Sequence, residues 1–172
     1  MFNQEKDSYK DYTYDIFTEY PNKLSNKYIS TGIYQIDQAL QGGIRKGELG
    51  CILAESQHGK STVLTIIGAN CYNQGYKVVH LVYEDFWIDI QQQYRNILQK
   101  NQTGDLKLID CVSKPIKTYE LGGLINDYKP DILIIDYAEI MPGTYNLKDI
   151  GKRFLLRENF IEIRRFAGQT ST

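Results

Sequence analysis

From Thr31 onward, the chain alternates short apolar runs with longer segments in which apolar residues recur at helical spacing. The apolar runs predict strands over residues 49–53, 77–83, 106–111 and 131–136. Residues 132–135 are apolar on both faces, which is typical of a central strand in a parallel sheet. Strands that alternate with helices along a chain form βαβ units, so we expect an α/β fold whose mainly parallel sheet is flanked by helices.

Helices are predicted between these strands. A helix over Ser61–Asn73 should end at Gly75, because glycine adopts the left-handed cap conformation at low cost. Thr118 is expected to cap a helix that runs to about Tyr128. Two more helices are indicated by apolar residues at helical spacing: Trp87, Ile90, Tyr94 and Ile97 in one, and Ile150, Phe154, Ile161 and Phe166 within residues 147–166 in the other.

The first 30 residues differ in character from the rest of the chain. They are polar and contain a group of tyrosines, Tyr9, Tyr12, Tyr14 and Tyr20. We interpret residues 1–30 as a tyrosine-rich leader and residues 31–172 as one folded core. Packing of these tyrosines on their own domain is favoured over docking on a neighbouring subunit, although exposed aromatic clusters also mark interfaces.

Composition limits the classes of function. The 172 residues are 42% hydrophobic and 24% charged, as in one globular domain with a real core, and their formal net charge is -1. Without an overall basic field, contact with nucleic acid would require a local patch or an assembly.

The chain also carries no sign of export. Its cysteines, Cys51, Cys71 and Cys111, are far apart and indicate reduced thiols in a core. The N-terminus lacks a signal-peptide pattern, and no apolar run approaches the roughly 20 residues of a membrane helix. We therefore expect a cytoplasmic protein without membrane contact.

The stretch AESQHGKS, which begins at Ala54, matches the phosphate-loop pattern G-x-x-x-x-G-K-[ST] except at its first position. Such a loop wraps phosphate with backbone N–H groups at a helix N-terminus, while its lysine reaches the phosphate oxygens and its hydroxyl ligates magnesium. An alanine costs little at the first position if its φ is negative. The expected nucleotide-binding residues are Ala54, Glu55, Ser56, Gln57, His58, Gly59, Lys60, Ser61 and Thr62.

Acidic residues follow two of the predicted strands. Asp136 closes the run DILIID, where a magnesium site needs a carboxylate, although a turn or cap aspartate would look the same. Glu84 follows the run KVVHLVY and is the candidate that polarises the attacking water, with an exposed strand-end acid as its alternative. Side-chain alternation directs the adjacent Asp85 away from the site. Glu139 is a second candidate acid, ranked below Glu84.

Other polar residues receive structural interpretations. Lys152, Arg153, Arg157, Arg164 and Arg165 share the last predicted helix, where a solvated face or a subunit contact is favoured over a DNA-binding stripe. His58 and His80 have no second ligand at metal-binding spacing, so zinc is not expected.

The segment STGIYQIDQALQGGIRKGELGCILAESQHGKST resembles the entry to the ATPase core of the RecA-like superfamily. In that family a T-G-x-x-x-[IL]-D-x-x-L-x-G-G leader and a G-E-L strand precede the phosphate loop. The matching residues are Thr31, Gly32, Ile36, Asp37, Leu40, Gly42, Gly43, Gly47, Glu48 and Leu49.

Within the superfamily, the chain is most similar to the DnaB-type replicative DNA helicases, particularly those of bacteriophages. Three features carry this similarity: VYED followed by a helix with Arg95, the stretch IIDYAEIM, which resembles the family's I-D-Y-x-x-[IL]-M, and the helix IEIRRFAG. Alanine at the first loop position also occurs among the phage relatives. The resemblance extends from about Thr31 to the end of the sequence.

The resemblance implies a RecA-like P-loop ATPase core that binds ATP and Mg²⁺, forms a hexameric ring and moves on single-stranded DNA. Carried over by position, Lys60 and Ser61 bind phosphate and magnesium, Glu84 activates water, and Asp136 holds the metal through its water shell. Arg95 would be a structural or subunit-contact residue. The expected partners are a primase or a helicase loader, in the cytoplasm of a bacterial host if a phage encodes the protein.

Several elements of the family have no counterpart before Thr172: the next strand with its polar γ-phosphate sensor, the DNA-binding loops and the arginine finger. We therefore expect a core whose C-terminal strands are absent. Because an arginine finger contributes about 10³ to 10⁵ in turnover in other enzymes, such a core would hydrolyse ATP slowly.

Two alternatives to the helicase core stay open. The T-G-x-x-x-[IL]-D motif and the phosphate loop fit a recombinase-like or KaiC-like regulatory ATPase equally well, although IDYAEIM favours the helicase. The other is a non-catalytic interaction module with a vestigial nucleotide site, which Ala54 and the missing elements support. The joint presence of Lys60, Ser61, Glu84 and Asp136 argues against it.

Overall fold

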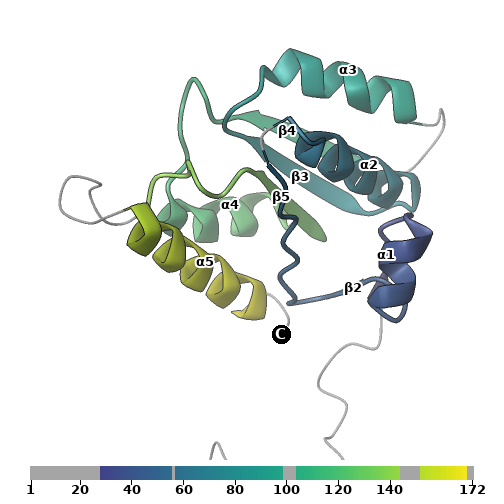
Figure 1. The fold of residues 1–172 in the computed structure, drawn as a ribbon, viewed down its shortest axis with the longest axis horizontal. Helices are drawn as coiled ribbons and strands as arrows, with labels where there is room; N and C mark the ends of the chain where they lie inside the picture. The colour runs from purple at the N-terminus through teal and green to yellow at the C-terminus, as the bar shows by residue number, and fades with distance from the viewer. Residues whose placement is uncertain (1–27, 56, 99–103, 144–151, 170–172) are drawn as a thin grey trace, which may run out of the picture.

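The structure is a computed structural model that describes residues 28–55, 57–98, 104–143 and 152–169 (Figure 1). The expected leader residues 1–27 and the start of the predicted last helix, residues 147–151, lie outside this part of the chain. The described elements are β1 (Tyr28–Ile29), α1 (Tyr34–Ala39), β2 (Ile44–Arg45), α2 (Lys60–Asn73), β3 (Lys77–Val82), α3 (Trp87–Ile97), β4 (Asp105–Asp110), η2 (Thr118–Glu120), α4 (Leu121–Tyr128), β5 (Ile132–Asp136) and α5 (Lys152–Gln169).

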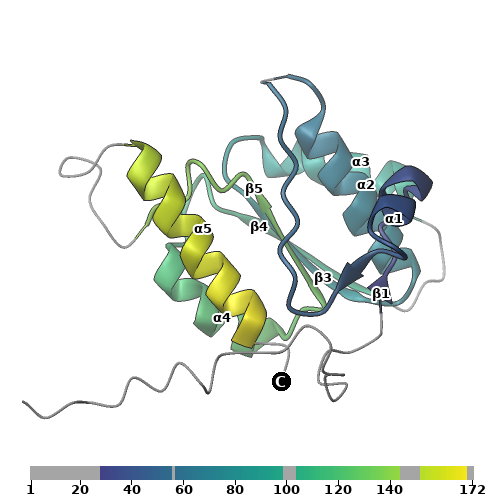
Figure 2. The same cartoon turned by 60° about the horizontal axis from the view of Figure 1, so that its bottom comes forward.

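A parallel three-stranded sheet in the order β4-β3-β5 forms the centre of the fold. Helices α2 and α3 cover one face of this sheet, and α4 and α5 cover the other (Figures 1 and 2). Strands β1 and β2 form a separate antiparallel pair. The expected α/β class with a parallel sheet between helices is therefore confirmed, whereas the antiparallel pair is an addition to the prediction.

Strand β3 is buried on both faces because its side chains alternate between apolar clusters on the two sides of the sheet. Val78 packs with α2, and Val82 packs with α2 and α3. Val79 and Leu81 point to the opposite face, where they pack with residues of α4 and α5. His80 lies on the same face as Val78 and Val82 and is fully buried. The strand that holds the two layers together is thus β3.

This arrangement corrects the predicted sheet at one side. Residues 49–53 form no strand, and the side chain of Leu53 is 88% exposed. A short apolar run becomes a strand only where a neighbouring strand supplies hydrogen bonds, and residues 49–53 do not join the ladder of β5. In the described sheet β5 is therefore an edge strand rather than the expected central one, and Ile132, Leu133 and Ile135 are only half-buried.

The helices confirm most of the predicted pattern. Gly75 ends α2 with φ of +90°, and the N–H groups of Gly75 and Tyr76 bond to the carbonyls of Tyr72 and Cys71, which is a Schellman cap. In α3, Ile90 and Tyr94 are buried as the helical spacing predicted.

Two details of the last helices differ from the prediction. The cap before α4 is not Thr118, which is buried; instead the Lys117 N–H donates to Glu120 Oε2 at 2.8 Å. In α5, Phe154 and Ile161 are exposed, because the helix buries Leu155, Asn159 and Ile163 instead. Asn159 donates to the carbonyl of Met141 at 2.8 Å, so a polar side chain ties α5 to the loop after β5.

Two of the three cysteines have the expected burial. Cys71 and Cys111 are buried, and burial raises the pKa of the Cys71 thiol to about 12. Cys51 is exposed, in contrast to the expectation, because it belongs to the segment that joins no strand. None of the helices in the described residues combines the length and hydrophobicity needed to cross a membrane.

Asp37 anchors the segment before the phosphate loop. Its Oδ1 accepts hydrogen bonds from the Thr31 N–H at 2.8 Å and the Thr31 hydroxyl at 2.7 Å, and its Oδ2 accepts from the Ser30 hydroxyl at 2.6 Å. Burial raises the pKa of this carboxyl, but the hydrogen bonds from Ser30 and Thr31 outweigh it, so the pKa is lowered. Asn70 of α2 then donates to the Thr31 carbonyl at 3.0 Å. The T-G-x-x-x-I-D stretch thereby ties the segment before α1 to α2.

Gly68 allows α2 and α3 to approach each other closely. A Cβ at this position would lie well inside contact distance of Tyr94 Oη and 3.0 Å from Ile134 Cδ1. The Tyr94 ring is buried and lies in the apolar cluster between the two helices. The absence of a side chain at Gly68 is thus a packing requirement.

We predict that Asp37→Asn lowers the free energy of unfolding by about 1.5–3 kcal/mol at pH 7, the usual range for hydrogen bonds to a charged group. Because the folded-state pKa lies below the ordinary value of 3.8, this stabilisation is present above pH 3.8 and is lost as the pH falls through the folded pKa. Urea unfolding of both proteins across this range measures the difference. Asp127→Asn, at an exposed position of α4, is the control, and an equal loss in both variants would contradict the role of Asp37.

We also predict that Gly68→Ala destabilises the fold by about 1–3 kcal/mol through overpacking. Tyr94→Phe removes the hydroxyl that the new methyl group meets, so the double variant should recover part of the loss in a double-mutant cycle. The control is Gly123→Ala in α4, where a Cβ meets nothing within 4 Å and alanine favours the helix. Equal unfolding midpoints for the two alanine variants would refute the close approach.

Candidate active site

The predicted phosphate loop leads directly into α2. Gly59, with φ of +79°, precedes the first helical residue, Lys60, and its carbonyl accepts the first helical hydrogen bond, from Val63, at 2.9 Å. Gln57 also has a positive φ, of +64°, whereas Ala54 does not. The alanine therefore meets the condition under which it can replace the first glycine. Ser56 lies outside the described residues.

Lys60 lies back across the loop. Its Nζ donates to the carbonyl of Ala54 at 3.0 Å and to that of Glu55 at 2.9 Å. The ammonium group is therefore held over the loop, beside the N-terminal end of α2, where the helix dipole is positive. A positive charge and a helix N-terminus together favour an anion at this place. Of the flanking residues, Gln57, His58 and Thr62 are exposed.

Asp136, at the end of β5, is where the predicted site residues meet. The carboxyl is 3% exposed, and burial, the largest influence, raises its pKa. Hydrogen bonding by Ser61 and the charge of Lys60 lower the pKa, whereas the charges of Asp85 and Glu84 raise it. The structure therefore brings Lys60, Ser61 and Glu84 within electrostatic reach of Asp136, at the carboxyl edge of the sheet.

The position of Asp85 corrects the argument from side-chain alternation. Both Glu84 and Asp85 lie in the turn after β3, so strand alternation no longer separates them. Both are exposed, and Asp85 influences Asp136 more strongly than Glu84 does. Glu139 belongs to the same region, because its charge and that of Glu84 contribute, after burial, to the raised pKa of Tyr137.

The donor set suits a cation that is shared with a ligand. In the described part of the chain, no three His, Cys, Asp or Glu side chains gather closely enough to hold a metal by themselves. Asp136 Oδ2 is buried and has no hydrogen-bond partner among the described residues. Mg²⁺ commonly uses one or two protein oxygens together with phosphates and water, and Ser61 with Asp136 meets that requirement.

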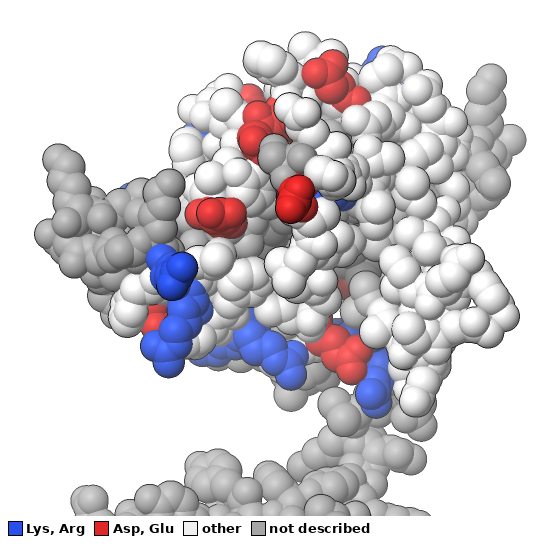
Figure 3. Space-filling model, in the orientation of Figure 1, with Lys and Arg blue, Asp and Glu red and all other residues white. Residues whose placement is uncertain are grey.

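Charge is unevenly distributed over the surface. Figure 3 shows positive side chains gathered over α5 and negative ones over the opposite part of the same face. Helix α5 carries Arg153, Arg157, Arg164 and Arg165, all of them exposed. Arg164 donates to the Gly47 carbonyl at 2.6 Å, so this arginine contributes to packing within the chain.

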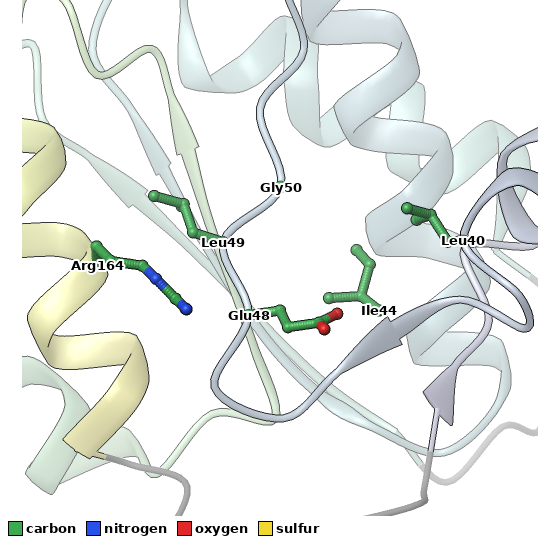
Figure 4. Close-up of a pocket in the computed structure, with 6 residues that line it drawn as sticks. All are labelled: Leu40, Ile44, Glu48, Leu49, Gly50 and Arg164. Carbon is green, nitrogen blue, oxygen red and sulfur yellow. The ribbon is translucent and has the colours of Figure 1, made fainter. Parts of the chain in front are cut away.

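A hollow of about 410 Å³ lies beside Arg164, next to the segment that leads to the phosphate loop (Figure 4). Its lining residues are Leu40, Ile44, Glu48, Leu49, Gly50 and Arg164. None of them belongs to the phosphate loop, and Glu48 is not among the charged groups that act on Asp136. This hollow is therefore separate from the candidate site.

The sequence analysis missed the contacts of His80 with the site. His80 Nδ1 lies 2.8 Å from Tyr94 Oη, and His80 Nε2 lies 3.9 Å from Asp136 Oδ2. A signal was available, because alternation within KVVHLVY places a histidine between two buried valines on one face of β3. A histidine buried in a central strand requires polar partners.

No protein-family model matches the chain, and no curated protein matches it.

Proposed function

We propose that the chain binds ATP with Mg²⁺ at the loop formed by residues 54–62 and hydrolyses it. The observation that carries this proposal is the convergence of a lysine, a serine and a buried aspartate beside a helix N-terminus. A lysine and a serine at the start of α2 beside a buried aspartate at the end of β5 have no joint structural purpose, since apolar residues would pack there at lower cost.

Each residue has a role that its chemistry allows. Lys60 and the N–H groups at the start of α2 would bind the β- and γ-phosphates. The Ser61 hydroxyl and Asp136, the latter through water, would hold Mg²⁺, which neutralises charge on the phosphates when it is bound. Lys60 is already desolvated in part and held by two carbonyls, and phosphate oxygens would replace those acceptors.

Hydrolysis requires a carboxylate that accepts the proton of the attacking water. Glu84 is our candidate for this base, since it is exposed at the carboxyl edge of the sheet and within electrostatic reach of Asp136. Asp85 shares both properties and is one methylene shorter, so the two acids compete for this assignment.

At a finer level, we propose that the chain is the core of a DnaB-type replicative helicase that acts as a hexameric ring on single-stranded DNA. The support is the resemblance in sequence, together with the way in which Asp37 of the T-G-x-x-x-I-D motif holds Thr31, whose carbonyl accepts a hydrogen bond from Asn70 of α2. A primase or a helicase loader would then be the protein partner. The recombinase-like or KaiC-like ATPase shares the leader and the loop and differs in lacking unwinding activity.

One observation favours a second candidate, a non-catalytic interaction module. Residues 49–53 precede the phosphate loop without pairing to β5, and Leu53 is 88% exposed. A loop that is anchored only on the side of α2 would bind phosphate weakly. Direct measurement of nucleotide binding separates this candidate from the ATPase.

We predict that Mg-ATP binds the 172-residue chain in the micromolar range and that Lys60→Ala weakens binding by roughly ten-fold to a hundred-fold, the value of one or two charge-assisted hydrogen bonds. Isothermal titration calorimetry measures both affinities. Lys46→Ala, an exposed lysine remote from the loop, should bind as the wild type does. A folded wild-type chain that binds no Mg-ATP would leave the interaction module as the better proposal.

We further predict that Glu84→Gln slows ATP hydrolysis by about 10² to 10⁴, the usual contribution of a general base, while ATP affinity is largely retained. Single-turnover hydrolysis with the protein in excess over ATP measures this rate even if turnover is slow. Asp85→Asn is the matched control, because it removes a neighbouring charge from the same turn. If Asp85→Asn carried the loss and Glu84→Gln did not, the base would be Asp85.

A further inference from the structure

The buried polar groups on the α3 side of the sheet form one connected line. Tyr94 Oη lies 2.8 Å from His80 Nδ1, and His80 Nε2 lies 3.9 Å from Asp136 Oδ2. The three residues come from α3, β3 and β5, and each is at most 3% exposed. The line ends at the carboxyl that meets Ser61 and the start of α2.

Two atoms in this line lack a hydrogen bond. Neither His80 Nε2 nor Asp136 Oδ2 has a partner among the described residues, and both atoms are buried. A buried polar group without a partner costs about 1–3 kcal/mol, so two such groups that face each other are strongly driven to pair. Their separation of 3.9 Å exceeds that of a direct hydrogen bond, so pairing requires a shift of the carboxylate or the ring.

The proton positions follow from the partners. Burial raises the pKa of the Tyr94 hydroxyl, which therefore keeps its proton and can donate to His80 Nδ1. A neutral imidazole whose Nδ1 accepts carries its proton on Nε2. His80 is fully buried, and its Nε2 faces Asp136 Oδ2 at 3.9 Å, so the Nε2–H is directed at the carboxylate.

We propose that His80 is a positioning residue for Asp136: Tyr94 fixes the tautomer of His80, whose Nε2–H holds Oδ2 of the carboxylate so that the other oxygen faces Ser61. This inference rests on the proposed function only for its consequence, which is that His80 sets the contribution of Mg²⁺ to nucleotide binding. Partners of metal-binding side chains typically contribute 10-fold to 100-fold in metal affinity.

Two substitutions of His80 separate the roles of its two ring nitrogens. In His80→Gln the amide nitrogen reaches the position of Nε2 and can still donate to Asp136. In His80→Asn the amide reaches only the position of Nδ1, so the contact with Tyr94 is kept and that with Asp136 is lost. Both variants remove the imidazole ring from the core, and a merely structural role would therefore affect them alike.

The first measurement uses the full chain without nucleotide. Long-range ¹H–¹⁵N NMR of the imidazole rings reports the tautomer of His80, and the chain has only one other histidine, His58. We expect the Nε2–H tautomer, ¹⁵N shifts that change in Asp136→Asn, and a mixed tautomer in Tyr94→Phe. An Nδ1–H tautomer, or ring shifts that do not respond to Asp136→Asn, would overturn the proposal whether or not the chain binds ATP.

The second measurement compares ATP affinity with Mg²⁺ and with EDTA. We expect His80→Asn to lose roughly ten-fold of the Mg²⁺-dependent gain in affinity, His80→Gln to retain most of it, and affinity in EDTA to be equal in all three proteins. Equal Mg²⁺ dependence in the two variants would reduce His80 to a core residue. Absence of ATP binding in the wild type would instead refute the proposed function. The NMR result would then still decide whether His80 donates a hydrogen bond to Asp136.

Discussion

The burial of β3 on both faces is the constraint on which the rest of the structure depends. Its alternate side chains pack against α2 and α3 on one side and against α4 and α5 on the other. The parallel ladders on its two edges then fix where β4 and β5 end, with Asp136 paired to Val82. The turn that bears Glu84 follows two residues later. The geometry of the candidate site is therefore a consequence of core packing.

The parts of the fold that the sequence predicts well are those decided by local pattern. The segments 77–83, 106–111 and 131–136 form strands within a residue of the expected bounds, and Gly75 ends α2 by a mechanism that depends on one residue. The strand predicted over residues 49–53 is absent, because an apolar run does not specify its hydrogen-bonding partner. The same limit explains α5, where the polar Asn159 is buried and the apolar Phe154 is exposed.

The residues of the candidate site also differ in how far local sequence pattern could predict them. The phosphate-loop motif proposed Lys60 and Ser61, and the rule that parallel strands end at one edge proposed Glu84 and Asp136; the structure places the other three near Asp136. Sequence reasoning separated Asp85 from this group because it assumed that β3 continues, whereas the strand ends at Val82. The contact between His80 and Tyr94 joins residues 14 positions apart on different elements, and no sequence pattern encodes that pairing.

The packing of Gly68 against Tyr94 has a mechanical consequence. Gly68 lies on the helix that begins at the phosphate loop, and Tyr94 lies on the helix that follows the Glu84 turn. Close-packed surfaces of this kind shift between discrete arrangements and do not deform smoothly. The two helices are therefore packed too closely to move independently at this contact. A displacement of α2 at its loop end would therefore require α3, and with it the acidic turn, to shift as well.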